Sequence, residues 1–154
     1  MTDTDRSDLF GAIRSAVAAA PNAQSAMTQT VRLLKDAIPY YTWVGIYLLD
    51  GNELVLGPYL GKPSPHTRIP LGRGVCGAAA AEKATIVVDD VNADARYLAC
   101  SVDTKSEIVV PIMQGAEVLG EIDIDSDRAA AFGVPDRQLL EPIAALLAER
   151  IAEA

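Results

Sequence analysis

Three acidic side chains in the C-terminal half of the sequence could meet on one face of a β-hairpin. Asp123 and Asp125 are two positions apart in a strand-like segment, so both side chains point to the same face. A turn near Gln114-Gly115 would place Glu107 opposite position 122, 123 or 124, and the middle register sets it against Asp123. Because like charges directly opposite each other destabilise a sheet, that register predicts a cation or a shared proton among the three carboxyl groups.

Three interpretations of this acidic face stay open. In another register the acids would be solvated and would have no special role. A hard cation such as Mg²⁺ or Ca²⁺ could bind there, although the sequence has no acidic loop of the usual spacing. A ligand with an ammonium group could also bind, and crowding would then keep one carboxyl group protonated as a general acid. We expect no metal ion and no cofactor.

The two cysteines are the candidate nucleophiles. Cys100 lies in an irregular segment ahead of a predicted strand, and reactive side chains are common in such loops. Cys76 follows Gly72-Arg73-Gly74 at the start of a predicted helix, where the helix N-terminus would lower the pKa of its thiol. The alternative for each cysteine is a role as a small buried apolar residue. His66, the single histidine, lies in a proline-rich loop and is predicted to be a surface residue rather than a catalyst.

The elements that must position these residues follow from hydrophobic spacing and turn residues. Helical periodicity predicts helices over 10–20, 25–38, 75–83 and 135–154. Runs of β-forming residues between turns predict strands over 43–49, 53–59, 85–88, 106–113 and 116–124. The segment 61–74 is predicted to be a loop that crosses one face of the sheet. Since hairpins dominate, we predict an α+β fold with a mostly antiparallel sheet and helices packed on it.

Length, charge and composition exclude several classes of function. The 154 residues fit a single domain over 1–154, and 50% of them are hydrophobic, which is enough for a substantial core. A formal net charge of −8 and the lack of a Lys/Arg cluster argue against a nucleic-acid partner. No apolar stretch is long enough to span a bilayer, and the polar N-terminus does not resemble a signal peptide. We therefore expect a cytoplasmic protein with no membrane partner, in which both thiols stay reduced.

Short motifs between Trp43 and Ser126 resemble, in order, those of the free methionine-(R)-sulfoxide reductases, a catalytic branch of the GAF-domain superfamily. The matching segments are 43–47 (WVGIY), 56–59 (LGPY), 61–62 (GK), 68–70 (RIP), 72–77 (GRGVCG), 99–100 (AC), 106–109 (SEIV) and 123–126 (DIDS). Each motif alone is weak, but the spacing of the set is compatible with the family. The resemblance implies a GAF fold, in which helices flank a central antiparallel sheet.

The resemblance also implies a chemistry. The family's nucleophile matches Cys100, whose thiolate would attack the sulfoxide sulfur of free methionine-(R)-sulfoxide while an acid protonates the departing oxygen. A sulfenic acid would form, and a second cysteine would close a disulfide that thioredoxin or another thiol opens. The residues that hold the substrate amine and assist protonation match Glu107, Asp123 and Asp125. The residues that pack against the methyl sulfide end match Trp43 and Tyr47.

One position departs from the family pattern. The usual resolving cysteine ahead of the Arg68-Ile69-Pro70 segment falls on His66, so the usual resolving disulfide cannot form. Cys76 could replace that cysteine, an external thiol could reduce the sulfenic acid directly, or the chain could keep only the pocket. In the last case it would be a non-catalytic GAF sensor that binds a small molecule. A module for protein contacts, with a homodimer face on the first and last helices, is a further alternative.

Overall fold

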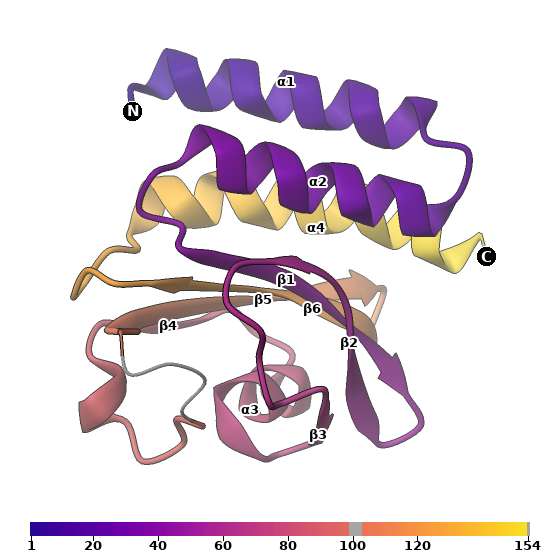
Figure 1. The fold of residues 1–154 in the computed structure, drawn as a ribbon. Helices are drawn as coiled ribbons and strands as arrows, with labels where there is room; N and C mark the ends of the chain where they lie inside the picture. The colour runs from indigo at the N-terminus through magenta and orange to yellow at the C-terminus, as the bar shows by residue number, and fades with distance from the viewer. Residues whose placement is uncertain (99–102, 154) are drawn as a thin grey trace.

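The computed structural model describes residues 1–98 and 103–153. In this part of the chain, a six-stranded antiparallel sheet has the order β3-β2-β1-β6-β5-β4 (Figure 1). The strands are β1 (Trp43–Asp50), β2 (Glu53–Leu60), β3 (Arg68–Pro70), β4 (Ile86–Val88), β5 (Ser106–Gln114) and β6 (Glu117–Ser126). The helices are α1 (Asp3–Ala19), α2 (Ala23–Ala37), α3 (Gly74–Glu82) and α4 (Val134–Ala152), with a 3-10 turn η1 (Val91–Ala93). The predicted α+β fold, a central antiparallel sheet flanked by helices, is confirmed.

Glycines close the two hairpins that build the centre of the sheet. Gly51, between β1 and β2, has a φ of 61°, and Gly115, between β5 and β6, has a φ of 58°. Glycine adopts this left-handed conformation without the steric cost that a Cβ atom would add. Both turns therefore lie where the sequence predicts them.

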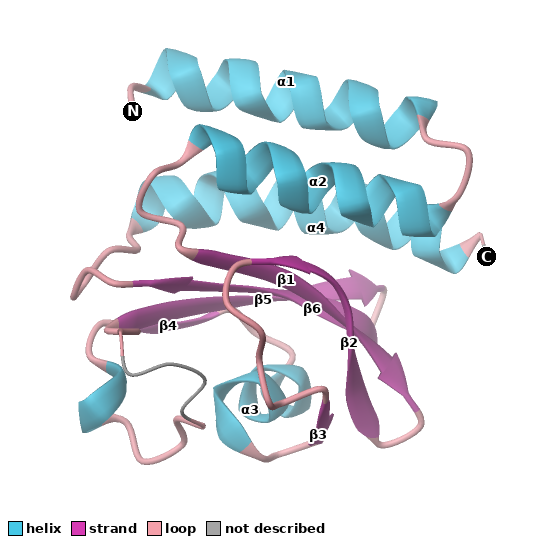
Figure 2. Ribbon diagram, viewed as in Figure 1, coloured by secondary structure: helices cyan, strands magenta, loops and turns pink. Residues whose placement is uncertain are grey.

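Helices α2 and α4 cover one face of the sheet, and α1 lies over them on the outer side (Figures 1 and 2). The core between these layers is apolar and comes from alternating strand positions together with one stripe of each helix. On the central strands it includes Val44, Ile46, Ile108, Ile122 and Ile124. Because Ile122 and Ile124 point into this core, the residues between and beside them on β6 point to the opposite face.

That opposite face is covered by α3 and by the connections around it (Figure 2). A second, smaller core lies here and includes Trp43 and Tyr47 from β1, Val109 from β5, and Val75 and Cys76 from α3. The acidic positions of β6 point to this same side. The sheet thus separates a largely apolar layer from a layer in which apolar, thiol and carboxyl groups are packed together.

Two elements differ from the prediction. Helix α1 begins at Asp3, earlier than predicted, because the Thr2 side chain accepts from the Asp5 N–H and Asp5 accepts from the Thr2 N–H, each at 3.0 Å. Strand β3 lies inside the predicted loop 61–74 and pairs with β2, Arg68 against Val55. Within the described residues, no helix has the length and apolarity that crossing a bilayer requires.

Candidate functional site

The register of the β5–β6 hairpin sets the geometry of the acidic face. Glu107 lies opposite Asp125, and Val109 lies opposite Asp123. The prediction that Glu107 faces position 122, 123 or 124 is therefore wrong. The cause is a register shift between Ile112 and Met113, where Met113 pairs with Val118 but Ile112 pairs with Gly120. Leu119 is the extra residue of this β-bulge on β6.

The bulge is what brings the acids to one face. Without it, continuing the turn's pairing would place Glu107 opposite Ile124, and Asp123 and Asp125 would point to the apolar core. The close approach of Gly120 to β1 accompanies the shift, since a Cβ atom there would lie 2.2 Å from the Tyr47 carbonyl oxygen. Only glycine fits against that backbone, so the sequence encodes the shape of the site at position 120.

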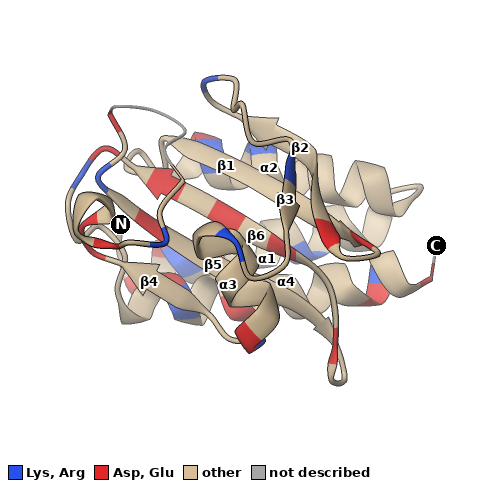
Figure 3. Ribbon diagram, turned by 90° about the horizontal axis from the view of Figure 1, so that it is seen from below, with Lys and Arg blue, Asp and Glu red and all other residues tan. Residues whose placement is uncertain are grey.

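Four carboxyl groups gather on this face: Glu107 from β5, and Glu121, Asp123 and Asp125 from β6. Figure 3, which views the sheet from the α3 side, shows the acidic positions along β6. Their exposed fractions are 5%, 0%, 3% and 2% in that order. The described residues include no ion pair to Glu121, Asp123 or Asp125. These three carboxyl groups are therefore buried without an ion-pair partner among the described residues.

Burial is the largest cause of the pKa shifts of Glu121, Asp123 and Asp125. It raises the pKa of Glu121 and Asp125 well above the ordinary values, and the neighbouring Asp123 charge raises both further. Burial also raises the pKa of Asp123, against the opposite effect of hydrogen bonding with Glu107 and Cys76. A raised pKa favours a protonated carboxyl group near neutral pH, which is the state that a general acid needs.

Glu121 is a member of the row that the sequence analysis missed. It pairs with Tyr47 on β1 and shares the face of Asp123, two residues further along β6. Neither of its carboxyl oxygens has a hydrogen-bond partner among the described residues. The signal was available in the alternation of Glu121, Asp123 and Asp125 with Ile122 and Ile124. It was passed over because acidic side chains are rarely buried, so the pattern did not suggest a fourth buried acid.

Cys76 lies in the first turn of α3 and points toward these acids. Its thiol donates to Oδ2 of Asp123 at 3.3 Å, and the residue is 5% exposed. Burial raises the pKa of the Cys76 thiol well above its usual value, and the charges of Asp123, Glu121 and Glu107 raise it further. The prediction that the helix N-terminus lowers this pKa is therefore wrong. The partial positive charge at the helix N-terminus would lower the thiol pKa, but burial and three nearby carboxyl groups raise it by more.

A cavity of about 20 Å³ lies where these groups meet. That volume suits one water molecule or one small ion. Its walls are formed by Tyr47, His66, Ile69, Gly74, Val75, Cys76, Leu98, Glu107 and Asp123. His66 is half-buried rather than a surface residue, and its carbonyl oxygen accepts from the Tyr47 hydroxyl at 2.8 Å.

The two predicted aromatic residues lie on the same face but not in the same place. Tyr47 lines the small cavity, whereas Trp43 lies further along β1, opposite Asp125. The Trp43 indole donates to the Lys62 carbonyl at 2.9 Å and stacks on Tyr59 at 5.6 Å between ring centroids. It borders a separate cavity of about 590 Å³, shared with Lys62. The structure therefore brings Tyr47, Cys76, Glu107 and Asp123 together around the small cavity. Asp125 lies opposite Glu107, and Trp43 lies opposite Asp125, outside the lining of that cavity.

Cys100, the predicted nucleophile, lies outside the described residues. The described residues that flank it contribute to both cavities: Leu98 lines the small one and Asp103 the larger one. The Asp103 carboxylate pairs with Lys62 at 2.6 Å.

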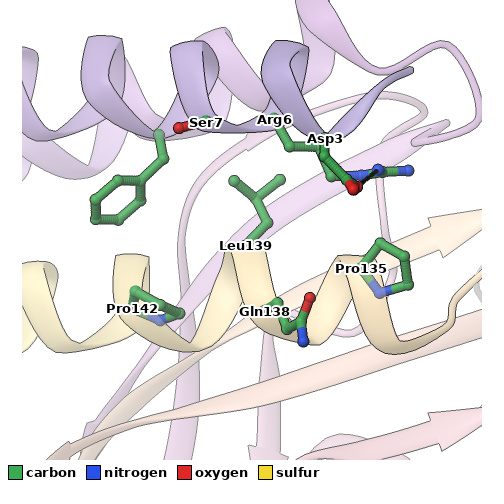
Figure 4. Close-up of a pocket in the computed structure, with 8 residues that line it drawn as sticks. Asp3, Arg6, Ser7, Pro135, Gln138, Leu139 and Pro142 are labelled. Atoms are coloured by element: carbon green, nitrogen blue, oxygen red, sulfur yellow. Dashed lines mark hydrogen bonds and ion pairs between the residues drawn. The ribbon is translucent and has the colours of Figure 1, made fainter.

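A further cavity, of about 280 Å³, lies between α1 and α4, on the other side of the sheet from the acids (Figure 4). Its lining includes Phe10, Leu139 and Pro142, with the Arg6–Asp3 ion pair of 3.3 Å at one end. It has neither a thiol nor an unpaired buried acid in its described lining. The acidic cavity is therefore the candidate site.

Known proteins share this fold and much of this sequence. The family model of the GAF domain matches residues 22–151. A free methionine-R-sulfoxide reductase from Escherichia coli (strain K12) is 37% identical over 126 residues, which are 82% of this chain and 76% of that protein. The X-ray structure of free methionine-R-sulfoxide reductase from Neisseria meningitidis in complex with its substrate has a TM-score of 0.92 and 38% identity, covering 99% of this chain and 92% of that one. A proposed GAF sensor protein from Burkholderia vietnamiensis has a TM-score of 0.92 and 35% identity, covering 99% and 98%.

The fold and the extent of these matches place the chain among the GAF domains. It belongs to the free methionine-(R)-sulfoxide reductase family.

Proposed function

We propose that the chain reduces free L-methionine-(R)-sulfoxide to methionine. The observation that carries this proposal is the row of buried carboxyl groups beside a cavity, with no basic partner to Glu121, Asp123 or Asp125 among the described residues. Buried charges need a counter-charge or a proton. A free amino acid supplies an ammonium group, and the E. coli and N. meningitidis relatives are named for that substrate.

In this proposal the acidic residues have different roles in binding the substrate. Glu107 and Asp123, which line the cavity, hold the ammonium group, and Asp125 adds its charge beside them. Tyr47 packs against the sulfur end from the cavity wall, and Trp43 closes the side next to Asp125. A sulfoxide amino acid is far larger than one water molecule, so the walls of the 20 Å³ cavity move apart when it binds.

The proposed reaction transfers oxygen from the substrate to a cysteine. The thiolate of Cys100 attacks the sulfoxide sulfur, and a protonated carboxyl group of the row gives its proton to the sulfoxide oxygen. The sulfur–oxygen bond of the substrate breaks, methionine leaves, and the oxygen ends on the cysteine as a sulfenic acid. The raised pKa of Asp123 and Asp125 supports a carboxyl group in the role of proton donor.

An external thiol is the proposed route of regeneration. The first thiol attacks the sulfenic acid and releases water, and a second thiol opens the mixed disulfide and restores Cys100. Thioredoxin or a small thiol would serve as this reductant. Cys76 is poorly suited to replace the missing cysteine at position 66, because burial and acidic neighbours favour its thiol over the thiolate that must attack.

The reductase proposal is tested by replacing the nucleophile. We expect Cys100→Ser to release no methionine from free methionine-(R)-sulfoxide, with dithiothreitol as reductant, because serine cannot accept the oxygen. Cys76→Ser should keep at least half of the wild-type methionine release under the same conditions. Methionine release by Cys100→Ser in a single turnover would overturn this assignment.

A non-catalytic sensor is the second candidate function. It is favoured by His66 at the position of the usual resolving cysteine and by the likeness to the proposed sensor protein from B. vietnamiensis. The same assay separates the two functions. Binding of methionine sulfoxide by calorimetry without any release of methionine from the wild type would establish the sensor and exclude the reductase.

A further inference from the structure

Three potential metal ligands converge on the small cavity. The Cys76 sulfur and one carboxyl oxygen each of Glu107 and Asp123 all lie within 4.8 Å of one another. Each residue lines the cavity of about 20 Å³, and each is at most 5% exposed. A space of that size accepts one ion or one water molecule. The donors therefore surround a volume that matches a single ion.

A second observation points to a cation at this place. Oδ1 of Asp123 is buried and finds no hydrogen-bond partner in the part of the chain that the structure describes, and the same holds for both carboxyl oxygens of Glu121. The charge of Glu121 raises the pKa of the Cys76 thiol. Buried carboxylates without partners are costly, by several kcal/mol for an isolated ion, so a cation that binds here removes a penalty already present in the fold.

The donor chemistry selects the kind of cation. Mg²⁺ and Ca²⁺ prefer sets made only of oxygen, and the sulfur of Cys76 does not suit them. Zn²⁺ binds thiolate and carboxylate together, at about 2.0–2.3 Å. In the tetrahedral arrangement that Zn²⁺ prefers, two such ligand atoms are at most roughly 3.8 Å apart, so atoms that now lie up to 4.8 Å apart must close by about 1 Å. The Cys76–Asp123 separation of 3.3 Å already lies inside that limit.

We propose that Cys76, Glu107 and Asp123 form a binding site for a zinc-like divalent ion, with Glu121 as an adjacent buried negative charge. On binding, the sulfur–hydrogen bond of Cys76 breaks and its proton passes to solvent, together with any proton that Glu107 or Asp123 holds. Sulfur–metal and oxygen–metal bonds form without a change in oxidation state. Binding of the ion does not depend on the reductase activity. If the proposed function holds, the ion occupies the place of the substrate ammonium group, and zinc is a reversible inhibitor.

Cobalt is the probe that tests the site. Reduced protein freed of metal is titrated with Co²⁺, and we expect one equivalent to bind with a near-ultraviolet sulfur-to-cobalt charge-transfer band, which Zn²⁺ then abolishes by displacement. Cys76→Ser should lose the band. Glu107→Gln and Asp123→Asn should each weaken binding by at least about tenfold. Glu117→Gln is the matched control, since Glu117 lies on β6 but is exposed, and its cobalt affinity should equal that of the wild type.

Cys100→Ser identifies which thiol binds the metal. The band should persist in Cys100→Ser, whereas its loss there, or its persistence in Cys76→Ser, overturns the proposal. Circular dichroism shows whether each variant folds, and if Cys76→Ser does not, Glu107→Gln and Cys100→Ser decide the outcome. A wild type that reduces methionine sulfoxide but binds no cobalt overturns the metal site alone. A wild type that binds cobalt but reduces nothing overturns the proposed function alone.

Discussion

At position 123, one carboxyl group has two different surroundings. Its Oδ2 atom accepts from the Cys76 thiol at 3.3 Å, while its Oδ1 atom is buried and has no hydrogen-bond partner within residues 1–98 and 103–153. The contact of Oδ2 fixes the orientation of the side chain. The unpaired Oδ1 atom is left as an acceptor for a ligand. Glu107 reaches the same cavity from β5. These two acids are therefore the residues whose removal is most informative.

We expect Glu107→Gln and Asp123→Asn each to lower kcat/KM for free methionine-(R)-sulfoxide by about 10²-fold or more, because each loses a charge for the ammonium group or a proton donor. Steady-state kinetics with dithiothreitol measures the effect. Glu117→Gln, on the exposed part of β6, is the control and should keep the wild-type value. Unchanged kinetics in both acid variants would place the site elsewhere.

Residue types could be read from the sequence better than residue environments. The shared face of Asp123 and Asp125 follows from strand alternation and is confirmed by their pairing with Gly45 and Trp43 on β1. The protonation state of the Cys76 thiol could not be predicted in that way. Its place in the first helical turn is visible locally, but its pKa is governed by burial and by acids that are distant in sequence.

Among the elements, the β5–β6 hairpin contains the one irregularity on which the site depends. Its turn follows from Gly115, but its bulge at Leu119 depends on the close contact of Gly120 with the backbone of β1. That contact is tertiary, so local sequence rules give the hairpin but not its register. The same limit applies to β3, a three-residue strand that exists only because β2 offers it an edge.

Gly120→Ala tests the role of the bulge. The new Cβ atom would lie 2.2 Å from the Tyr47 carbonyl oxygen, and a backbone atom cannot rotate away as a side chain can. We expect a loss of about 1–3 kcal/mol in the free energy of unfolding, measured with urea, together with lost methionine sulfoxide reduction. Gly11→Ala on α1 has no atom within 4 Å of its new Cβ and should be neutral or stabilising by up to about 1 kcal/mol. Equal stability of the two variants would contradict this account of the bulge.

On the scale of the whole molecule, the two faces of the sheet differ in how their polar groups are satisfied. On the helical side, Asp136 of α4 is buried but accepts from the hydroxyls of Tyr40 and Tyr41, each at 2.7 Å. Arg150 donates to the carbonyl oxygens of Val17 and Ala20 at the end of α1. On the acidic side, neither carboxyl oxygen of Glu121 has a hydrogen-bond partner among the residues that the structure describes. The buried carboxyl group of α4 is therefore hydrogen-bonded on the helical face, whereas that of Glu121 on the acidic face is not.

This asymmetry predicts a pH dependence of global stability. The folded-state pKa of Glu121 is raised, so the folded chain holds a proton that the unfolded chain releases above about pH 4.3. The contribution of this proton to the free energy of unfolding is complete below that pH and is lost as the pH rises through the folded-state pKa of Glu121. We expect the free energy of unfolding, measured with urea between about pH 5 and 8, to fall with pH.

Glu121→Gln should make that fall shallower, by up to about 1.4 kcal/mol per pH unit, because the amide binds no proton. Glu117→Gln should keep the slope of the wild type, since Glu117 is exposed. Identical slopes in the wild type and in Glu121→Gln would show that Glu121 does not titrate in this range.

The position of the indole on β1 has an optical consequence. Trp43 is the only tryptophan in the sequence, and it stacks on Tyr59 while pairing with Asp125 at the end of the acidic row. Intrinsic fluorescence excited at the red edge of the absorption band thus comes from one site, next to the charges that a bound cation neutralises. The native chain carries its own reporter of occupancy, and binding can be followed without a label.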